Sequence, residues 1–219
     1  MKPTTTIIIA MLGLVQAATA TIVLRYDEPR PYLSSIATQP GTSVLIPYYD
    51  EQGFRTKAFG SIPSQPPYNS AIGINGPNNS ADSMRPNNDT AHMAVLMNGS
   101  VEIFHLEDLP FRAITIDLAE YSTFFSEPRT IVFEGVRESG GSVFTTFITD
   151  GIIEGGFSTD DFETFYFPPE FTNLTMLRSS STLYAFDNVT LTIIPEPAPL
   201  VLLALPALGW CCLRRRRTA

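Results

Sequence analysis

Two stretches of strict alternation between apolar and polar residues constrain the fold of this 219-residue chain most. Ile and Leu alternate with Thr and Asp over residues 114–118, and Val, Leu and Ile alternate with Thr over residues 189–193. A period of two places the apolar side chains of a strand on one face, so each stretch predicts a half-buried β-strand. Outside the chain ends, no run of ten or more residues combines a helical period with capping residues. The sequence therefore predicts an all-β domain.

Further β-rich runs follow one another at short intervals. Residues 130–137 and 143–149 flank Glu138-Ser139-Gly140-Gly141-Ser142, in which glycine supplies the positive φ of a hairpin turn. About ten short strands at this spacing favour an antiparallel β-sandwich of jelly-roll type, and the 15 Phe and eight Tyr suffice to fill its core. The other expected strands are 21–26, 44–49, 54–59, 94–97, 101–106, 162–167, 175–178 and 183–186.

One segment, residues 62–91, lacks this rhythm. It holds five prolines and six asparagines and shows no apolar period. This composition predicts a long loop, which is either a plain insertion or a binding surface.

The N-terminus has the three parts of a secretory signal peptide. Lys2 gives a positive start, residues 7–15 form an apolar run, and Ala18 and Ala20 provide a small-residue cleavage site. The apolar run is too short to span a membrane. We expect the general secretion machinery to export the chain, with cleavage of the 1–20 signal peptide after Ala20 or, as the alternative, after Ala17.

The exported domain, residues 21–194, is strongly acidic. From Thr21 to Pro197, nine Lys and Arg stand against 22 Asp and Glu, which gives a formal net charge of −13. Such a charge disfavours nucleic acid and anionic membrane surfaces as partners. Both cysteines, Cys211 and Cys212, lie outside this domain, so it folds without disulfides and has no thiol nucleophile.

The C-terminus, residues 195–219, carries a tail of three parts. The tripeptide Pro195-Glu196-Pro197 comes first, an apolar run over residues 198–213 follows, and the end is basic, with Arg214, Arg215, Arg216 and Arg217. As a transmembrane helix the run is about 24 Å long, which is marginal for a hydrocarbon core of about 30 Å. The arginines place its end in the cytoplasm, so the domain is expected on the far side of the cytoplasmic membrane.

This tail resembles the PEP-CTERM sorting signal of bacterial exported proteins. The resemblance implies that Pro195, Glu196 and Pro197 are recognised by an exosortase, that the apolar helix is a transient anchor, and that the arginine cluster is a stop signal. It also implies delivery to the cell surface or the extracellular space. The alternative is a single-pass membrane-anchored binding protein that is never processed.

The second half bears a looser resemblance to sandwich domains that precede this kind of tail. The resemblance is carried by Phe133-Glu134-Gly135, Gly140-Gly141, residues 162–168 and Phe186-Asp187-Asn188-Val189. It implies a jelly roll similar to carbohydrate-binding modules, and therefore polysaccharide as a partner. Aromatic residues available for sugar stacking are Tyr48-Tyr49, Tyr68 and Phe124-Phe125, although paired aromatics in strands more often fill the core.

The sequence shows no recognisable nucleophile–base pair. The two histidines are His92 and His105, and neither has a serine elbow, a cysteine or a second metal ligand at a suitable spacing. His105 lies between Phe104 and Leu106 in an expected strand, where a surface or hydrogen-bonded histidine is far commoner than a catalytic base. We therefore expect a non-catalytic surface or matrix protein. The alternative is an extracellular hydrolase that acts on polysaccharide with two carboxylates.

Oxygen-bearing side chains near expected strand ends suggest one metal site. Asp160, Asp161, Asp187 and Asn188 are ligands of the kind that calcium prefers, although no EF-hand spacing is present. These residues predict a structural calcium site, with solvated acidic loops as the alternative. No other cofactor is expected.

Overall fold

The computed structural model describes residues 20–27, 43–58, 72–75, 85–96, 99–125, 127–153 and 161–195. Within these ranges the chain is almost entirely β, and the helical element is the one-turn η1 (Thr123–Phe125). The strands are β1 (Thr21–Leu24), β2 (Ser43–Ile46), β3 (Tyr48–Glu51), β4 (Phe54–Ala58), β5 (Ile72–Asn75), β6 (His92–Val95), β7 (Val101–His105), β8 (Phe111–Glu120), β9 (Thr130–Arg137), β10 (Ser142–Ile148), β11 (Glu163–Tyr166), β12 (Leu174–Ser179) and β13 (Tyr184–Ile193).

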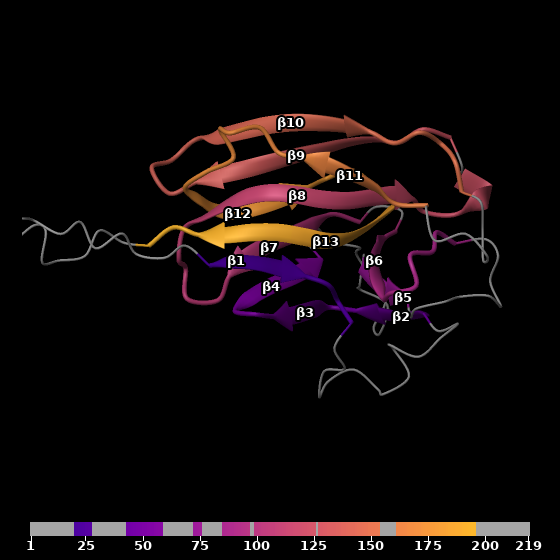
Figure 1. Ribbon diagram of the computed structural model, residues 1–219, viewed down its shortest axis with the longest axis horizontal. Helices are drawn as coiled ribbons and strands as arrows, with labels where there is room; N and C mark the ends of the chain where they lie inside the picture. The colour runs from indigo at the N-terminus through magenta and orange to yellow at the C-terminus, as the bar shows by residue number, and fades with distance from the viewer. Residues whose placement is uncertain are drawn as a thin grey trace, which may run out of the picture.

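Antiparallel pairing arranges these strands in two layers (Figure 1). The first layer has the order β2-β5-β6-β13-β8-β11, with β1 beside the second half of β13. The second layer has the order β3-β4-β7-β12-β9-β10. The described strands of the two layers are joined where Leu174 of β12 pairs with Phe111 of β8. The all-β antiparallel prediction is therefore confirmed, in the form of a sandwich.

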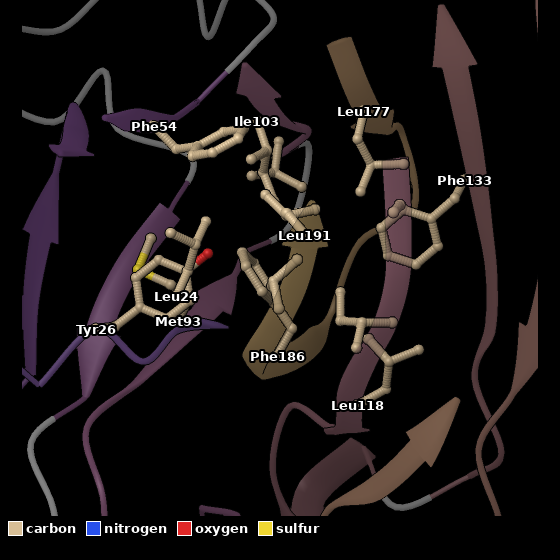
Figure 2. Packing of buried hydrophobic residues seen from close by; sticks show 14 of the residues in the cluster. Leu24, Tyr26, Phe54, Met93, Ile103, Leu118, Phe133, Leu177, Phe186 and Leu191 are labelled. Carbon is tan, nitrogen blue, oxygen red and sulfur yellow. The ribbon is translucent and has the colours of Figure 1, made fainter. Parts of the chain in front are cut away.

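The hydrophobic core fills the space between the layers. Ile103 of β7 and Leu191 of β13 come from opposite layers, and Figure 2 shows both side chains in the shared interior. Edge-to-face aromatic pairs add specific geometry there, with ring centroids 5.6 Å apart for Tyr26 and Phe186. Because alternate residues of each strand enter this core, the residues between them are left for the two outer faces.

A β-bulge interrupts the long central strand β13. The register against β8 shifts between Asp187 and Thr190, and Asn188 takes a φ of +46° at this point. The extra residue lets both Phe186 and Val189 face the core, although three positions separate them. The expected strands 183–186 and 189–193 are therefore one continuous strand.

Two sequence predictions about local structure are wrong. The expected loop at 62–91 contains β5, whose Ile72 and Ile74 are fully buried. Its pairing with β2 and β6 is non-local, so four residues around Gly73 gave no sufficient local signal. The expected strand 44–49 is divided into β2 and β3 at Pro47, because proline has no N–H to donate to a ladder.

The hairpin between β9 and β10 forms as predicted. Gly140 and Gly141 have φ values of +86° and +78°, and the Arg137 N–H donates to the Gly141 carbonyl at 3.1 Å. Within β9, Gly135 marks a close approach of neighbouring side chains. A Cβ built there would lie 2.8 Å from Leu174 Cδ2 and 3.0 Å from Val143 Cγ2.

Candidate functional site

One line of side chains crosses the whole outer face of the second layer. Strand register places its members directly opposite one another on six adjacent strands, β3, β4, β7, β12, β9 and β10. Five of its members are at least partly exposed on the outer face, whereas Glu102 is buried, with 3% of its surface exposed. We call this line the cross-sheet row; in order it is Tyr48, Lys57, Glu102, Arg178, Glu134 and Phe144.

The middle of the cross-sheet row is a run of alternating charges. Lys57 Nζ lies 3.2 Å from Glu102 Oε2, and Arg178 Nε donates to Glu134 Oε2 at 2.7 Å. These four groups cancel in formal charge, on a domain whose other surfaces must carry the acidic excess. The row is therefore a neutral, hydrogen-bonding strip on an otherwise anionic protein.

At the β3 end, neighbouring side chains outside the cross-sheet row hold its members in place. Arg55 forms a two-point pair with Asp50, with N–O distances of 2.7 Å and 2.8 Å, and its guanidinium carbon lies 4.3 Å from the centre of the Tyr48 ring. Lys57 Nζ lies 5.1 Å from the centre of the Phe104 ring. These cation–π contacts hold the long basic side chains in place, which lowers the entropy cost of binding a ligand over them.

At the β10 end the row borders a surface hollow of about 280 Å³. The hollow is lined by hydroxyl groups, charged groups and apolar side chains: Ser100, Val132, Glu134, Phe144, Arg178, Ser179 and Ser180. Phe144 is 65% exposed and offers apolar ring surface beside polar groups. An apolar surface with a few convergent polar groups is what small-molecule and sugar sites share.

The carboxylate of Glu134 is held in its ionised form. The Arg178 guanidinium donates to it, the Ser142 hydroxyl donates to Oε1 at 2.6 Å, and together they lower the pKa of Glu134 below its ordinary value. A general acid for glycoside hydrolysis needs a raised pKa. The two carboxylates of the row, Glu102 and Glu134, are also separated by Arg178, which suits binding better than acid–base chemistry.

A second hollow, of about 230 Å³, lies on the first layer. Leu45, Gly73, Asn75, Arg85, Ala94, Leu96 and Tyr121 line it. Asn75 connects two basic side chains there, because its Oδ1 accepts from Arg85 at 2.7 Å and its amide nitrogen lies 2.9 Å from His92 Nε2. Burial lowers the pKa of His92 to about 4, so the imidazole is neutral at physiological pH. His92 is thus part of a buried polar network.

The predicted calcium ligands that the structure describes hold one segment of the chain, residues 85–91. Asp161 accepts the N–H of Asn87 at 2.9 Å, and Asp187 accepts from the Asn88 amide at 2.7 Å and the Thr90 hydroxyl at 2.8 Å. The backbone N–H of Asn188 donates to Asp187 Oδ1 at 2.7 Å, whereas its side-chain amide donates to Asp117 at 2.9 Å.

Burial raises the pKa of Asp187 to about 8. Among the described residues, no group of three or more His, Cys, Asp or Glu side chains is arranged to hold a metal ion, and Asp160 lies outside them. The calcium site stays a prediction, and its test is the melting temperature with and without a chelator, because a metal that binds the folded state stabilises it.

The expected sorting tail and the expected signal peptide fall almost wholly outside the described ranges. Ala20 and Pro195 are the outermost described residues, whereas Ala18, Glu196, Pro197 and the arginines at 214–217 are not described. Among the described residues no helix is long and apolar enough to cross a membrane, and the expected span at 198–213 lies beyond them.

Sequence reasoning found the right residue types but did not assemble the cross-sheet row. Tyr48 faces outward as one of the candidate sugar-stacking aromatics, while its neighbour Tyr49 is buried in the core. Phe124 is exposed on η1, away from the row, and Tyr68 is outside the described residues. The available signal was the polar or aromatic residue at every second position of several strands, as at Arg55 and Lys57.

The fold and its outer face define this chain as a two-layered antiparallel β-sandwich with a polar and aromatic strip across one sheet. Its structure is similar to that of a DUF4465 family protein from Bacteroides caccae, with a TM-score of 0.52 and 8% sequence identity over 80% of this chain and 100% of that chain. At this identity the likeness concerns the fold alone.

A second solved structure shows a weaker likeness. It contains the CBM22-1 and GH10 modules of endo-1,4-β-D-xylanase 10B from Clostridium thermocellum in complex with xylohexaose. The TM-score is 0.29 and the identity 13%, over 52% of this chain and 24% of that one. No family model matches the sequence, and no curated protein does.

Proposed function

We propose that this chain is an exported, non-catalytic β-sandwich of jelly-roll type that binds a polysaccharide along the cross-sheet row. The observation that carries the proposal is the continuity of the row over six adjacent strands. Five strand spacings of about 4.8 Å give it a length of about 24 Å, which suits an extended polymer better than a single small molecule.

The chemistry of the row matches that of a sugar chain. Sugar rings present hydroxyl groups at their edges and apolar C–H faces, so they are bound by charged or amide groups next to aromatic rings. Arg178 and Glu134 supply donors and acceptors at the centre, and Phe144 supplies an exposed ring at one end. Because the row is neutral and residues Thr21 to Pro197 together carry −13, a neutral polysaccharide is favoured over an acidic one.

The competing function is an extracellular hydrolase that acts on polysaccharide. The lowered pKa of Glu134 speaks against it, because this carboxylate stays ionised where a general acid would hold its proton. In a binding protein the same ion pairs serve to keep the donors and acceptors in fixed positions.

Electrophoresis through gels that contain a dissolved neutral polysaccharide tests the proposal. We expect at least one such polysaccharide to retard the exported protein and Phe144→Ala to abolish the retardation. The matched control is Tyr166→Ala, because Tyr166 is 73% exposed on β11 of the other layer. Equal retardation of both variants and the original protein would show that the cross-sheet row is not the binding site. Release of reducing ends from the polysaccharide would favour the hydrolase.

We also propose that the tail is an exosortase signal, so that the protein is first held in the cytoplasmic membrane and then released to the surface or exterior. The domain supports this arrangement because its last strand ends at Ile193, and the Ile194 N–H still donates to the Pro110 carbonyl at 2.9 Å. Pro195 therefore follows the folded domain directly, which leaves the motif at the junction between domain and anchor.

A further inference from the structure

Strand β10 forms an open edge of the second layer. All seven residues from Ser142 to Ile148 pair with β9, and among the described strands β10 has no other partner. Figure 1 shows it along the outer rim of the molecule. The outward N–H and C=O groups of such an edge are a template for a further strand.

Natural edge strands usually carry features that prevent pairing with other chains, and β10 lacks them. The opposite edge, β3, follows Pro47 and contains Asp50 and Glu51. Charges, prolines, bulges and short length are the usual protection. The sequence of β10, Ser-Val-Phe-Thr-Thr-Phe-Ile, has no charge and no proline, and its pairing with β9 shows no register shift.

The same edge is also apolar. Phe144 and Ile148 are 65% and 60% exposed, and Val132 of the neighbouring β9 is partly exposed beside them. Burying these side chains would be favourable at about 25 cal/mol for each Å² removed from water. An uncharged, apolar edge on a chain that carries −13 from Thr21 to Pro197 is a place where a second copy can approach without bringing carboxylates together.

We propose that β10 pairs antiparallel with β10 of a second copy of this chain, about a two-fold axis at Thr145. The strand is self-complementary in this register: Phe144 opposes Thr146 of the second copy, Val143 opposes Phe147, and Ser142 opposes Ile148. A two-fold axis gives each copy the same contacts, and the second layers of both copies become one continuous sheet. The cross-sheet rows of the two copies then lie on one shared face.

The solution mass of the exported protein, measured by light scattering over a concentration series, tests this pairing without any polysaccharide. We expect a dimer that dissociates on dilution. Thr145→Lys should give a monomer, because an inward-pointing lysine on an edge strand blocks further pairing. Ser139→Lys adds the same charge in the exposed hairpin turn and should leave the dimer intact.

A second variant covers the case in which Thr145→Lys unfolds the domain, which a melting curve reveals. Phe144→Asp with Thr146→Asp changes exposed residues and places like charges directly opposite across the axis, so it should also give a monomer. A monomeric original protein at all concentrations would overturn the proposal. So would a dimer that persists in a folded blocking variant.

Cross-linking tests the register. Antiparallel partners lie about 4.5–5.5 Å apart at Cα, which is within disulfide reach, so Thr145→Cys should oxidise to a covalent dimer. The exported domain has no other cysteine to confuse the result. Ser142→Cys should not cross-link, since Ser142 lies opposite Ile148 in this register; a cross-link there would indicate parallel strands and overturn the arrangement.

Discussion

Thr21, the first residue of β1, pairs with Thr192 near the end of β13. The first and last described strands are thus antiparallel neighbours, so the two ends of the described chain lie at the same end of the sandwich. The folded part begins at the residue after Ala20 and ends one residue before Pro195. Two membrane-directed segments attached to these ends would therefore emerge from the domain next to each other.

The N-terminus of the exported protein is expected to be Thr21, because Ala18 and Ala20 form the expected cleavage site and β1 starts directly after it. Cleavage after Ala17 would instead place Ala18 at the N-terminus. Mass spectrometry of the exported protein distinguishes the two ends. Intact Met1 on protein at the surface or in the medium would contradict the signal peptide.

The two parts of the tail should fail differently when each is replaced. Neutral residues at 214–217 remove the orientation signal and the stop, so the protein should be mislocalised. Ala-Ala-Ala at Pro195-Glu196-Pro197 leaves the helix and arginines intact, so this variant should stay in the membrane with its full tail.

The tail comparison requires a host that carries the matching exosortase. The measurements are cell fractionation and the intact mass of each variant, with the original tail as control. Trimming and release of the alanine variant like the original would show that the tripeptide is not recognised, and the tail would then be only an anchor.

Replacing Asp187 with asparagine should remove a pH dependence of stability. Burial raises the pKa of Asp187 to about 8, so the folded protein keeps this proton while the unfolded chain loses it above about pH 4. The free energy of unfolding should therefore fall as pH rises from about 4 to 8 and level off above that. Asp187→Asn should flatten this part of the profile, as measured by urea unfolding at several pH values.

Asp108→Asn is the matched control for Asp187→Asn. Asp108 is an exposed turn residue with a φ of +56°, a conformation that asparagine tolerates well. Its substitution should leave the slope between pH 4 and 8 unchanged. An identical slope for the Asp187 variant and the original protein would mean that Asp187 is ionised in the folded state.

Gly135→Ala should destabilise the domain by about 1–3 kcal/mol, because its Cβ would lie 2.8 Å from Leu174 Cδ2 and force side chains of the core to move. Ser139→Ala in the adjacent exposed turn is the control and should change stability by less than about 0.5 kcal/mol. Denaturant midpoints measure both. A Gly135 variant as stable as the control would show that the packing around Leu174 can adjust without cost.

Strands with a strong local period were predictable, and those held by distant partners were not. The alternation at 114–118 and 189–193 lies within β8 and β13. In β5, Ile72 and Ile74 are buried, but Gly73 is flanked by a segment rich in proline and asparagine. This segment becomes a strand only through its pairing with β2 and β6, and neither partner is adjacent to it in the sequence.

The cross-sheet row could not be predicted, because its members are brought together by the register between strands, and register cannot be read from the sequence alone. The cross-sheet row joins Tyr48 and Arg178, which lie on strands far apart along the chain. A shift of one residue in any pairing would send a member of the row into the core. For His105 the sequence left a surface or a hydrogen-bonded histidine open. The structure shows the second: His105 is buried, contacts the Phe54 ring, and accepts the N–H of Glu107 at 3.1 Å.

Strand β13 is the last of the described strands and lies in the middle of the first layer, between β8 on one side and β6 and β1 on the other. β1 has no other described partner. It can therefore join the sheet only after β13, about 170 residues later in the sequence, is available to pair with it. Contacts this distant in sequence slow folding and expose unpaired strands meanwhile. For a chain that crosses a membrane from its N-terminus, the sandwich can close only after its final residues arrive. If the chain is exported in this direction, as proposed, its folding is coupled to the completion of export.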